Sequence, residues 1–309
     1  MPVMDQSSAS HAPFRCGYVA IIGAPNVGKS TLMNALLRQK ISIVTPKPQT
    51  TRHRVLGILS SDSAQIIFLD TPGIITPRYA LQESMMLSAT ASIEDADVVV
   101  LLADASRRGQ EEDEDLAFQH IHGMQKPVLL VLNKIDLVSK QELLPEIEAV
   151  ARMHPFTAII PVSALREDGT ERIIPALVPL LPEHPPYFPL DIVSEQHQRF
   201  FVAELIREQV FLKAREEVPY ATTVEIVEFS EREEGRWLIR AEIYVERDSQ
   251  KGILIGKNGA MLREVGSAAR REIERFLEHP VYLDLRVRVR EKWRNDEAWL
   301  QRLGYGHDR

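Results

Sequence analysis

Short apolar runs separated by helix-like segments fill the first half of the chain. They consist mostly of Val, Ile, Leu and Ala, and they lie at 18–22, 55–59, 65–69, 97–104, 127–132 and 158–162. Continuous apolar strands alternating with helices are typical of a mostly parallel sheet that is covered on both faces. We therefore expect an α/β fold for this half, with helices flanking the sheet.

The second half has a different pattern. An amphipathic segment at 198–216 precedes two strands with alternating apolar and polar residues, 221–229 and 237–245. Two further helical segments and a strand at 281–290 follow, which gives the order α-β-β-α-α-β. Strict alternation predicts a sheet with one buried and one wet face, so we expect a separate α+β domain.

A proline-rich stretch, which follows a helix predicted at 172–180, separates the two patterns. Four of the nine residues at 181–189 are prolines, which stiffen the backbone and remove hydrogen-bond donors. A chain of 309 residues also exceeds the usual size of one hydrophobic core. We predict a flexible tail at 1–14, a first domain at 15–181, a semi-rigid linker at 182–192 and a second domain at 193–309.

Composition and charge narrow the class of protein. With 44% hydrophobic and 26% charged residues, no long apolar run and no signal-like start, the chain is expected to be cytoplasmic. The net charge is −7, yet residues 251–309 hold 13 Lys and Arg against 9 Asp and Glu. The basic end of the chain is therefore the candidate nucleic-acid surface. The single cysteine, Cys16, is expected in the tail region and has no motif around it.

The first candidate site follows the strand at 18–22. Its sequence fits G-x-x-x-x-G-K-[ST], a glycine loop whose backbone N–H groups surround nucleotide phosphates. Lys29 would reach the β- and γ-phosphates, and the Ser30 hydroxyl would bind Mg²⁺. The predicted nucleotide-binding residues of this loop are Gly23, Ala24, Pro25, Asn26, Val27, Gly28, Lys29, Ser30 and Thr31.

Two further segments are placed to sense the γ-phosphate. The polar loop at 45–54 offers Thr50 or Thr51 as a second hydroxyl ligand for Mg²⁺, and we assign this role to Thr51. Asp70 ends an apolar strand, where α/β sheets place ligands, and is expected to hold the metal through its water shell. Thr71, Pro72 and Gly73 follow it, and the Gly73 N–H would meet the γ-phosphate.

Base recognition is predicted at the ends of two later strands. Asn133, Lys134 and Asp136 follow the strand at 127–132, and a carboxylate at Asp136 can accept hydrogen bonds from both N1–H and the exocyclic amine of guanine. Adenine presents the opposite pattern, so the ligand is expected to be GTP or GDP. Ser163, Ala164 and Leu165 would add backbone contacts to the guanine O6.

A second candidate site lies in the basic C-terminal end of the chain. Gly256, Lys257, Asn258 and Gly259 form a G-x-x-G turn between two helical segments, where glycines admit a nucleic-acid backbone and the lysine neutralises a phosphate. We expect an apolar groove behind Ile253, Ile255 and Leu262 to accept unstacked bases. Arginines at 286, 288 and 290 would either contact RNA or form a solvated strand face.

The four nucleotide motifs, in this order, resemble those of the translation-factor-like P-loop GTPases. The residue sequence of the glycine loop and the Gln-Thr-Thr-Arg at 49–52 are similar to those of the Era and TrmE branch. That resemblance implies slow intrinsic hydrolysis, with Lys29 and Thr51 as catalytic residues, and a K⁺ site beside the phosphates at Asn26. Ras-like GTPases carry a water-orienting glutamine after the glycine of the second switch, whereas this chain has Ile74, which cannot orient water. The group that replaces the glutamine is left open.

The second half resembles a type II KH domain, and a GTPase followed by such a domain is the layout of the Era family of GTPases. The resemblance covers residues 15–306 and implies a GTP-dependent switch that binds small-subunit (16S-type) rRNA near its 3′ end and assists assembly of the small ribosomal subunit. It also implies peripheral association with the inner face of the cell membrane. A monomer is our working expectation. One alternative is a constitutive RNA-binding module in which nucleotide only stabilises the fold; another is a tRNA-modifying GTPase, which would need a catalytic cysteine or cofactor domain.

Overall fold

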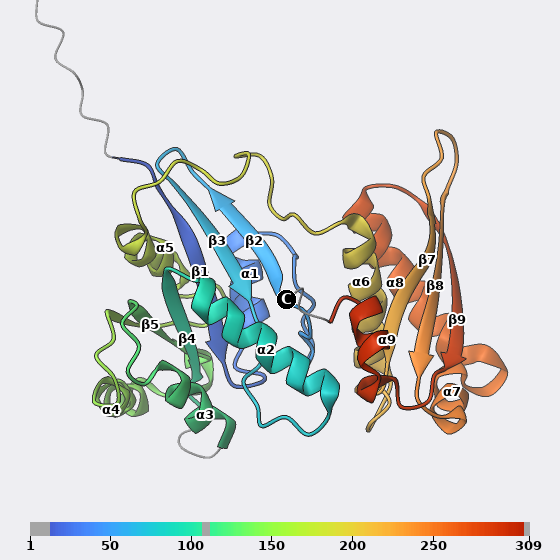
Figure 1. Cartoon of the computed structure of the whole chain (residues 1–309), viewed down its shortest axis with the longest axis horizontal. Coiled ribbons are helices and arrows are strands. Elements are labelled where there is room, and N and C mark those ends of the chain that lie inside the picture. The colour runs from blue at the N-terminus through green and yellow to red at the C-terminus, as the bar shows by residue number, and fades with distance from the viewer. Residues whose placement is uncertain (1–12, 107–111, 306–309) are drawn as a thin grey trace, which may run out of the picture.

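The computed structural model describes residues 13–106 and 112–305, and it contains two sheets, each covered by its own helices (Figure 1). Most of the tail expected at 1–14 lies outside the described residues. The larger sheet has the strand order β2-β3-β1-β4-β5-β6, in which only β2 runs antiparallel to its neighbour. Its strands are β1 (Arg15–Gly23), β2 (Val55–Ser60), β3 (Ala64–Asp70), β4 (Val98–Asp104), β5 (Val128–Asn133) and β6 (Ala158–Pro161).

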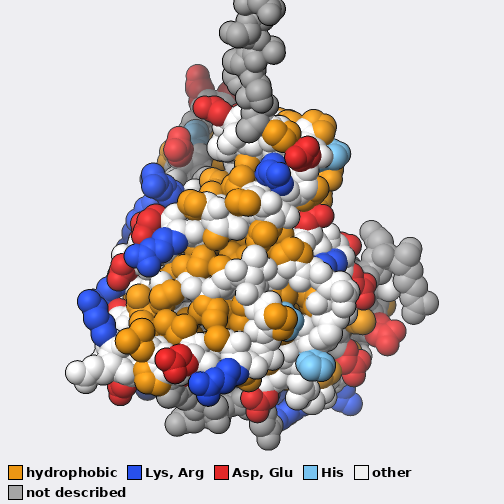
Figure 2. Space-filling model, turned by 90° about the vertical axis from the view of Figure 1, so that its left-hand side faces the viewer, with side chains coloured by type: hydrophobic (Ala, Val, Ile, Leu, Met, Phe, Trp, Pro, Cys, Tyr) orange, Lys and Arg blue, Asp and Glu red, His pale blue; other side chains and the backbone are white. Residues whose placement is uncertain are grey.

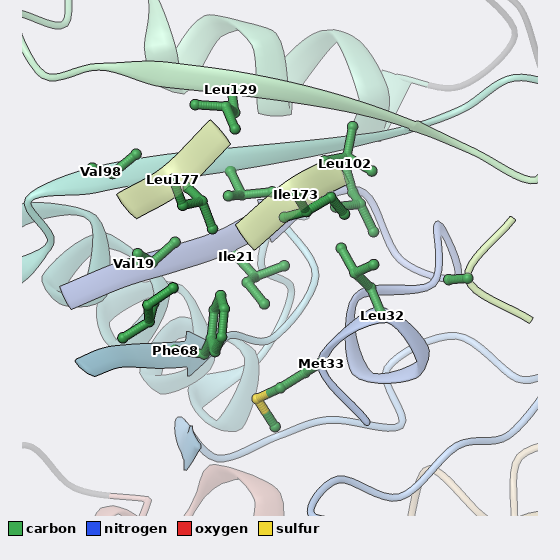
Figure 3. Close-up of a cluster of buried hydrophobic side chains, with 14 of the residues drawn as sticks. Val19, Ile21, Leu32, Met33, Phe68, Val98, Leu102, Leu129, Ile173 and Leu177 are labelled. Carbon is green, nitrogen blue, oxygen red and sulfur yellow. The ribbon is translucent and has the colours of Figure 1, made fainter. Parts of the chain in front are cut away.

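Helices cover both faces of this sheet, as the continuous apolar strands predict. The helices are α1 (Lys29–Leu37), α2 (Ala80–Asp95), α3 (Glu112–Ile121), α4 (Lys140–Ala151) and α5 (Ile173–Leu177). Helices α1 and α5 pack on one face, where Leu32 and Ile173 meet Ile21 and Phe68 (Figure 3). Helices α2, α3 and α4 pack on the other face. Every residue of β3 and β4 is buried, so the motifs that follow these strands are attached to a rigid base.

The smaller sheet has the order β7-β8-β9, with β7 antiparallel and β9 parallel to β8. Its elements follow the expected order α-β-β-α-α-β: α6 (Gln198–Lys213), β7 (Thr223–Ser230), β8 (Trp237–Val245), α7 (Asp248–Ile255), α8 (Ala260–Leu277) and β9 (Val281–Val289). Apolar residues of α6 and α8 cover one sheet face. A short helix, α9 (Glu297–Arg302), ends the described chain beside α2, where Leu81 and Met85 pack against Trp293 and Leu300.

The proline-rich segment is bound to the first sheet rather than acting as a free spacer. The Pro182 carbonyl accepts from the Cys16 N–H at 3.1 Å, and farther along the segment the Val193 carbonyl accepts from the Ile58 N–H at 2.7 Å. The Gln65 amide also bonds the Phe188 backbone in both directions. Proline keeps its carbonyl as an acceptor, and Pro182 uses it here. The exact domain limits of 181 and 193 stay predictions.

Two local expectations need correction. Cys16 is fully buried in β1 and does not belong to the tail region. The helix expected before the linker is divided into a 3₁₀ turn (Thr170–Arg172), α5 and a second 3₁₀ turn (Val178–Leu180), because Pro175 and Pro179 each remove a backbone donor.

Surface character also bears on function. Among the helices of residues 13–106 and 112–305, none combines the length and apolar character needed to cross a bilayer. Figure 2 shows that the side on which α4 and α5 lie gathers many hydrophobic side chains, with charges mainly around their margin. Large exposed apolar residues of this half include Leu144 and Met153, which are 67% and 52% exposed.

Candidate functional site

The glycine loop between β1 and α1 is shaped by close contacts with later strands. Gly23 has φ 149°, and a Cβ there would lie 2.4 Å from the Leu102 carbonyl oxygen at the end of β4. Gly28 has φ 103°, and its Cβ would lie 2.3 Å from the Asn133 amide nitrogen. Only glycine tolerates both the left-handed backbone and these approaches. The loop is therefore held against the ends of β4 and β5.

A cavity of about 470 Å³ opens beside this loop. Eleven of the predicted nucleotide-binding residues line it: Pro25, Asn26, Gly28, Lys29, Ser30, Thr31, Gly73, Asn133, Lys134, Asp136 and Leu165. The other eight are not among the lining residues, namely Gly23, Ala24, Val27, Asp70, Thr71, Pro72, Ser163 and Ala164. The volume is in the range of small-ligand sites, and the lining joins the loop to the base-recognition motifs.

Lys29 is the buried cation of the cavity. Its Nζ donates to the carbonyl oxygens of Gly23 and Ala24 at 3.0 and 2.9 Å. Burial lowers the pKa of Lys29 to about 8, although Asp70 acts in the opposite direction. A buried ammonium held only by carbonyl groups favours an anionic ligand, because a phosphate would restore its preference for the charged form.

The three predicted metal ligands come together. The Ser30 Oγ lies 2.8 Å from the Thr51 Oγ1 and donates to the Asp70 Oδ2 at 2.7 Å. Thr50 instead bonds inside its own loop, to Thr45 Oγ1 and the Lys47 carbonyl. The geometry thus favours Thr51 over Thr50.

Asp70 is fully buried, and its Oδ1 has no hydrogen-bond partner among the described residues. Burial raises the pKa of Asp70, while the Ser30 hydroxyl, the Lys29 charge and the nearby Ser42 hydroxyl oppose that effect. An unpaired buried carboxylate oxygen beside two hydroxyl groups suits Mg²⁺, which prefers oxygen ligands and retains several waters. The residues present therefore fit this ion.

Asn133 fastens three motifs together. Its Nδ2 donates to the Val27 carbonyl at 2.7 Å, and its Oδ1 accepts from the Ala164 N–H at 2.9 Å. Asp136 lies next to it in the cavity; one carboxylate oxygen accepts from Ser163 Oγ at 2.7 Å, and the other is 3.5 Å from Arg166 Nε. The Asp136 carboxylate is thereby oriented at the cavity rim, as guanine recognition requires.

Several lining residues were not among the predicted ones. Val44, Thr45 and Gln49 come from the polar loop before β2, and Leu137 directly follows Asp136. The length of the polar loop indicated a functional segment. Which of its residues face the cavity is decided by tertiary contacts, which the sequence does not show. Ile74 points the other way, since its side chain is fully buried in the core beneath α2 and its N–H bonds the Gly23 carbonyl.

The second site is the G-x-x-G turn between α7 and α8. Gly256, Asn258 and Gly259 all have positive φ, between 50° and 74°. Lys257 and Asn258 are exposed, and the Arg263 guanidinium holds the turn from α8 by donating to the Asn258 and Gly259 carbonyls. The turn therefore presents its polar backbone and a lysine to solvent.

The groove beside this turn differs from the expected one. It has a volume of about 480 Å³ and is lined by Gly259, Leu262, Arg263, Gly266, Ser267, Arg270, Leu283 and Leu285. Leu262 is present as predicted, whereas Ile253 and Ile255 are absent from the lining. Ile253 is 49% exposed on α7, and Ile255 packs on the core of the smaller sheet. The groove runs between α8 and β9, so helix-to-strand packing and not the preceding helix defines it.

The arginines in β9 and directly after it form ion pairs. Arg286 lies 3.5 Å from Asp284, Arg288 3.0 Å from Glu242, and Arg290 2.9 Å from Asp296. The pairing favours the interpretation of a solvated strand face over that of an RNA-contacting ladder.

Comparison with known proteins supports the assignment of both domains. The family model for 50S ribosome-binding GTPases matches residues 18–134, and that for KH domains matches residues 217–294. GTPase Era of Geobacter metallireducens is 48% identical over 297 residues, covering 96% of this chain and 99% of that protein.

Two solved structures match both halves of the chain. The structure of a single-residue variant of Aquifex aeolicus Era bound to GDP·AlF₄⁻ and that of Era in complex with MgGDPNP and nucleotides 1506–1542 of 16S ribosomal RNA each have a TM-score of 0.91 and 41% identity. Each alignment covers 95% of this chain and all of the other. From its motifs, its two-domain fold and this full-length similarity, the chain belongs to the Era family of GTPases.

Proposed function

We propose that this protein is a GTP-hydrolysing switch that binds small-subunit rRNA near its 3′ end and assists assembly of the small ribosomal subunit. The observation that carries the proposal is the presence, on one chain, of a nucleotide cavity with an oriented Asp136 and a groove beside a G-x-x-G turn. The similarity to an Era that is bound to MgGDPNP and 16S rRNA supports this combination.

In the nucleotide site, each residue would act through its own donor or acceptor groups. Lys29 would leave its carbonyl partners to hold the β- and γ-phosphates, and the Gly73 N–H would meet the γ-phosphate. A Cβ at Gly73 would lie 2.8 Å from the Pro25 nitrogen, so this glycine permits the second switch to approach the loop. Ser30, Thr51 and Asp70 would hold Mg²⁺, which neutralises phosphate charge when bound.

Hydrolysis is proposed to be slow. Ile74 is turned into the core, so attacking water would be held by the polar loop, by a partner or by K⁺. Asn26 supports a K⁺ site: its Nδ2 donates to the Pro46 carbonyl at 3.1 Å, and its Oδ1 accepts no hydrogen bond within the described residues. We expect replacement of K⁺ by Na⁺ to lower turnover, and Asn26→Ala to abolish the difference between the two cations.

We further propose a cytoplasmic monomer that associates peripherally with the inner face of the membrane. The hydrophobic side shown in Figure 2 supports this association. Co-sedimentation with vesicles of phosphatidylethanolamine and phosphatidylglycerol tests it; a protein that stays entirely in the supernatant at low salt would contradict it.

The central experiment measures affinity for a single-stranded RNA that matches the 3′ end of small-subunit rRNA, first with GDP and then with a non-hydrolysable GTP analogue. A scrambled RNA of equal length is the control. A difference of several-fold between nucleotides supports the switch. Equal affinity in both states would favour the constitutive RNA-binding module instead.

A further inference from the structure

The polar loop between α1 and β2 touches both domains. We define the switch segment as residues 40–54. On one side, Thr45, Thr50 and Thr51 line the nucleotide cavity. On the other side, the segment lies against α6, the first helix of the second domain, with which it exchanges several charged hydrogen bonds.

The first set of bonds runs from α6 to the switch backbone. Arg207 is 1% exposed, pairs with Glu204 and donates to the Thr50 carbonyl at 2.5 Å. Glu208 is 3% exposed and accepts from the Val44 N–H at 3.0 Å. Charged side chains buried to this degree make strong, directional hydrogen bonds. One helix therefore holds the switch backbone at two points, Val44 and Thr50.

The second set runs in the opposite direction. Lys47 donates to the Phe211 carbonyl and to the Ala214 carbonyl at 2.5 Å, where α6 ends and its last carbonyls are otherwise unsatisfied. Arg52 is 4% exposed and donates to carbonyls of the turn after α6, including that of Thr222 at 2.7 Å. The switch segment cannot move independently of the helix without breaking the hydrogen bonds of the buried Arg52 and the half-buried Lys47.

One peptide unit connects this contact to the metal ligands. Arg207 holds the carbonyl of Thr50, and the next residue, Thr51, places its Oγ1 2.8 Å from Ser30. Two relatives that match both domains hold GDP·AlF₄⁻ and MgGDPNP. In this structure α6 is docked on the switch segment, and Thr51 of that segment lies together with Ser30 and Asp70.

We propose that Arg207 is a positioning residue of the second domain that sets Thr51 for Mg²⁺ and the triphosphate. The proposal rests on the proposed GTPase function. Docking of α6 and binding of Mg·GTP then favour each other, since coupling between two sites is reciprocal. GDP, which lacks the γ-phosphate that orders the switch segment, depends little on this docking.

The test uses the full chain with Glu204→Gln and Arg207→Met together. Neutralising both partners keeps the shape of the Glu204 side chain and the apolar stem of Arg207, and it avoids a buried unpaired carboxylate. Arg199→Met is the matched control, because Arg199 lies on the same helix but stacks on Phe229, away from the switch segment. Titrations measure affinity for a non-hydrolysable GTP analogue with Mg²⁺, affinity for GDP, and the Mg²⁺ concentration that half-saturates analogue binding.

We expect the double variant to bind the analogue about tenfold more weakly, which corresponds to the loss of about one charged hydrogen bond. We also expect it to need a higher Mg²⁺ concentration for half-saturation. GDP affinity should stay within about twofold of wild type, as should all values for the control. Equal loss for analogue and GDP, or no loss for either, overturns the inference while leaving the GTPase proposal intact. A wild-type chain without Mg²⁺-dependent analogue binding overturns both.

Lys47→Met gives a second measurement from the switch side of the contact, should the double variant unfold. It removes the bonds to the end of α6 while its apolar stem is retained. The same selective loss for the Mg·GTP analogue supports the inference, and an unchanged ratio of analogue to GDP affinity overturns it.

Discussion

Gly266 gives the sharpest test of the RNA groove. It lies in the middle of α8, where a glycine costs about 1 kcal/mol relative to alanine. Its backbone is not left-handed, and an added Cβ would lie 3.4 Å from Leu285 Cδ1, which is an ordinary contact. Neither backbone nor packing therefore requires glycine here. The groove does, because Gly266 lines it and a methyl group would occupy space that a base could use.

Gly266→Ala should have opposite effects on stability and on RNA binding. We expect the free energy of unfolding to rise by about 0.5–1 kcal/mol, because alanine loses less conformational entropy on folding. We expect RNA affinity to fall about tenfold, or about 1.4 kcal/mol, which lies within the range for contacts to one base.

Gly252→Ala in α7 is the matched control. This glycine is also inside a helix, and its added Cβ would meet nothing within 4 Å. It should give the same gain in stability without loss of RNA affinity. Thermal unfolding and fluorescence anisotropy with the 3′-end RNA measure both quantities. If the two variants bind RNA equally well, bases do not approach α8 at Gly266 and the groove assignment is wrong.

Three further predictions address the other sites. Asp136→Asn should shift preference from guanine toward xanthine nucleotides in a competition assay, and unchanged GTP selectivity would remove base recognition from Asp136. Gly259→Asp should weaken RNA binding but not GDP binding, whereas Gly235→Asp, with similar positive φ and open space but in the β7–β8 turn, should affect neither. Burial lowers the pKa of His53 from 6.5 to about 4, so the unfolded chain binds the extra proton between these values, and stability should fall by about 3 kcal/mol as pH drops through this window. His53→Phe, which keeps a ring against Tyr305, should flatten that dependence in pH-resolved unfolding; an unchanged slope would contradict it.

The sequence could predict most of the first site because its information is local. Each motif directly follows a buried strand, and parallel strands end at one edge of a sheet, so Ser30, Asp70 and Asp136 had to converge. The contacts that each residue makes within a motif were harder to predict. Asn133 uses both ends of its amide on Val27 and Ala164, and only the packing of three loops reveals that arrangement.

The second site was predicted with less accuracy for the same reason. The G-x-x-G turn is a local signal, and the structure has it between two helices as expected. The groove is a tertiary feature made by one face of α8 and strand β9, and the sequence does not reveal which of their side chains meet. Proximity along the chain suggested Ile253, which is 49% exposed on α7 and is not among the residues that line the groove, so its contact with RNA stays a prediction.

The polar face of α6 shows what an amphipathic pattern leaves undetermined. Its charges predict a helix face that points away from the core of the second domain and is exposed to solvent. Arg207 and Glu208 are instead buried against the switch segment of the other domain. An interface of charged groups can be exposed to water at small cost, because each group regains hydration when the domains separate. The apolar contact at α2 lacks that property, since exposing Leu81 and Trp293 costs free energy in proportion to their area. The part of the interface that touches the nucleotide cavity is thus the part whose opening a nucleotide could control.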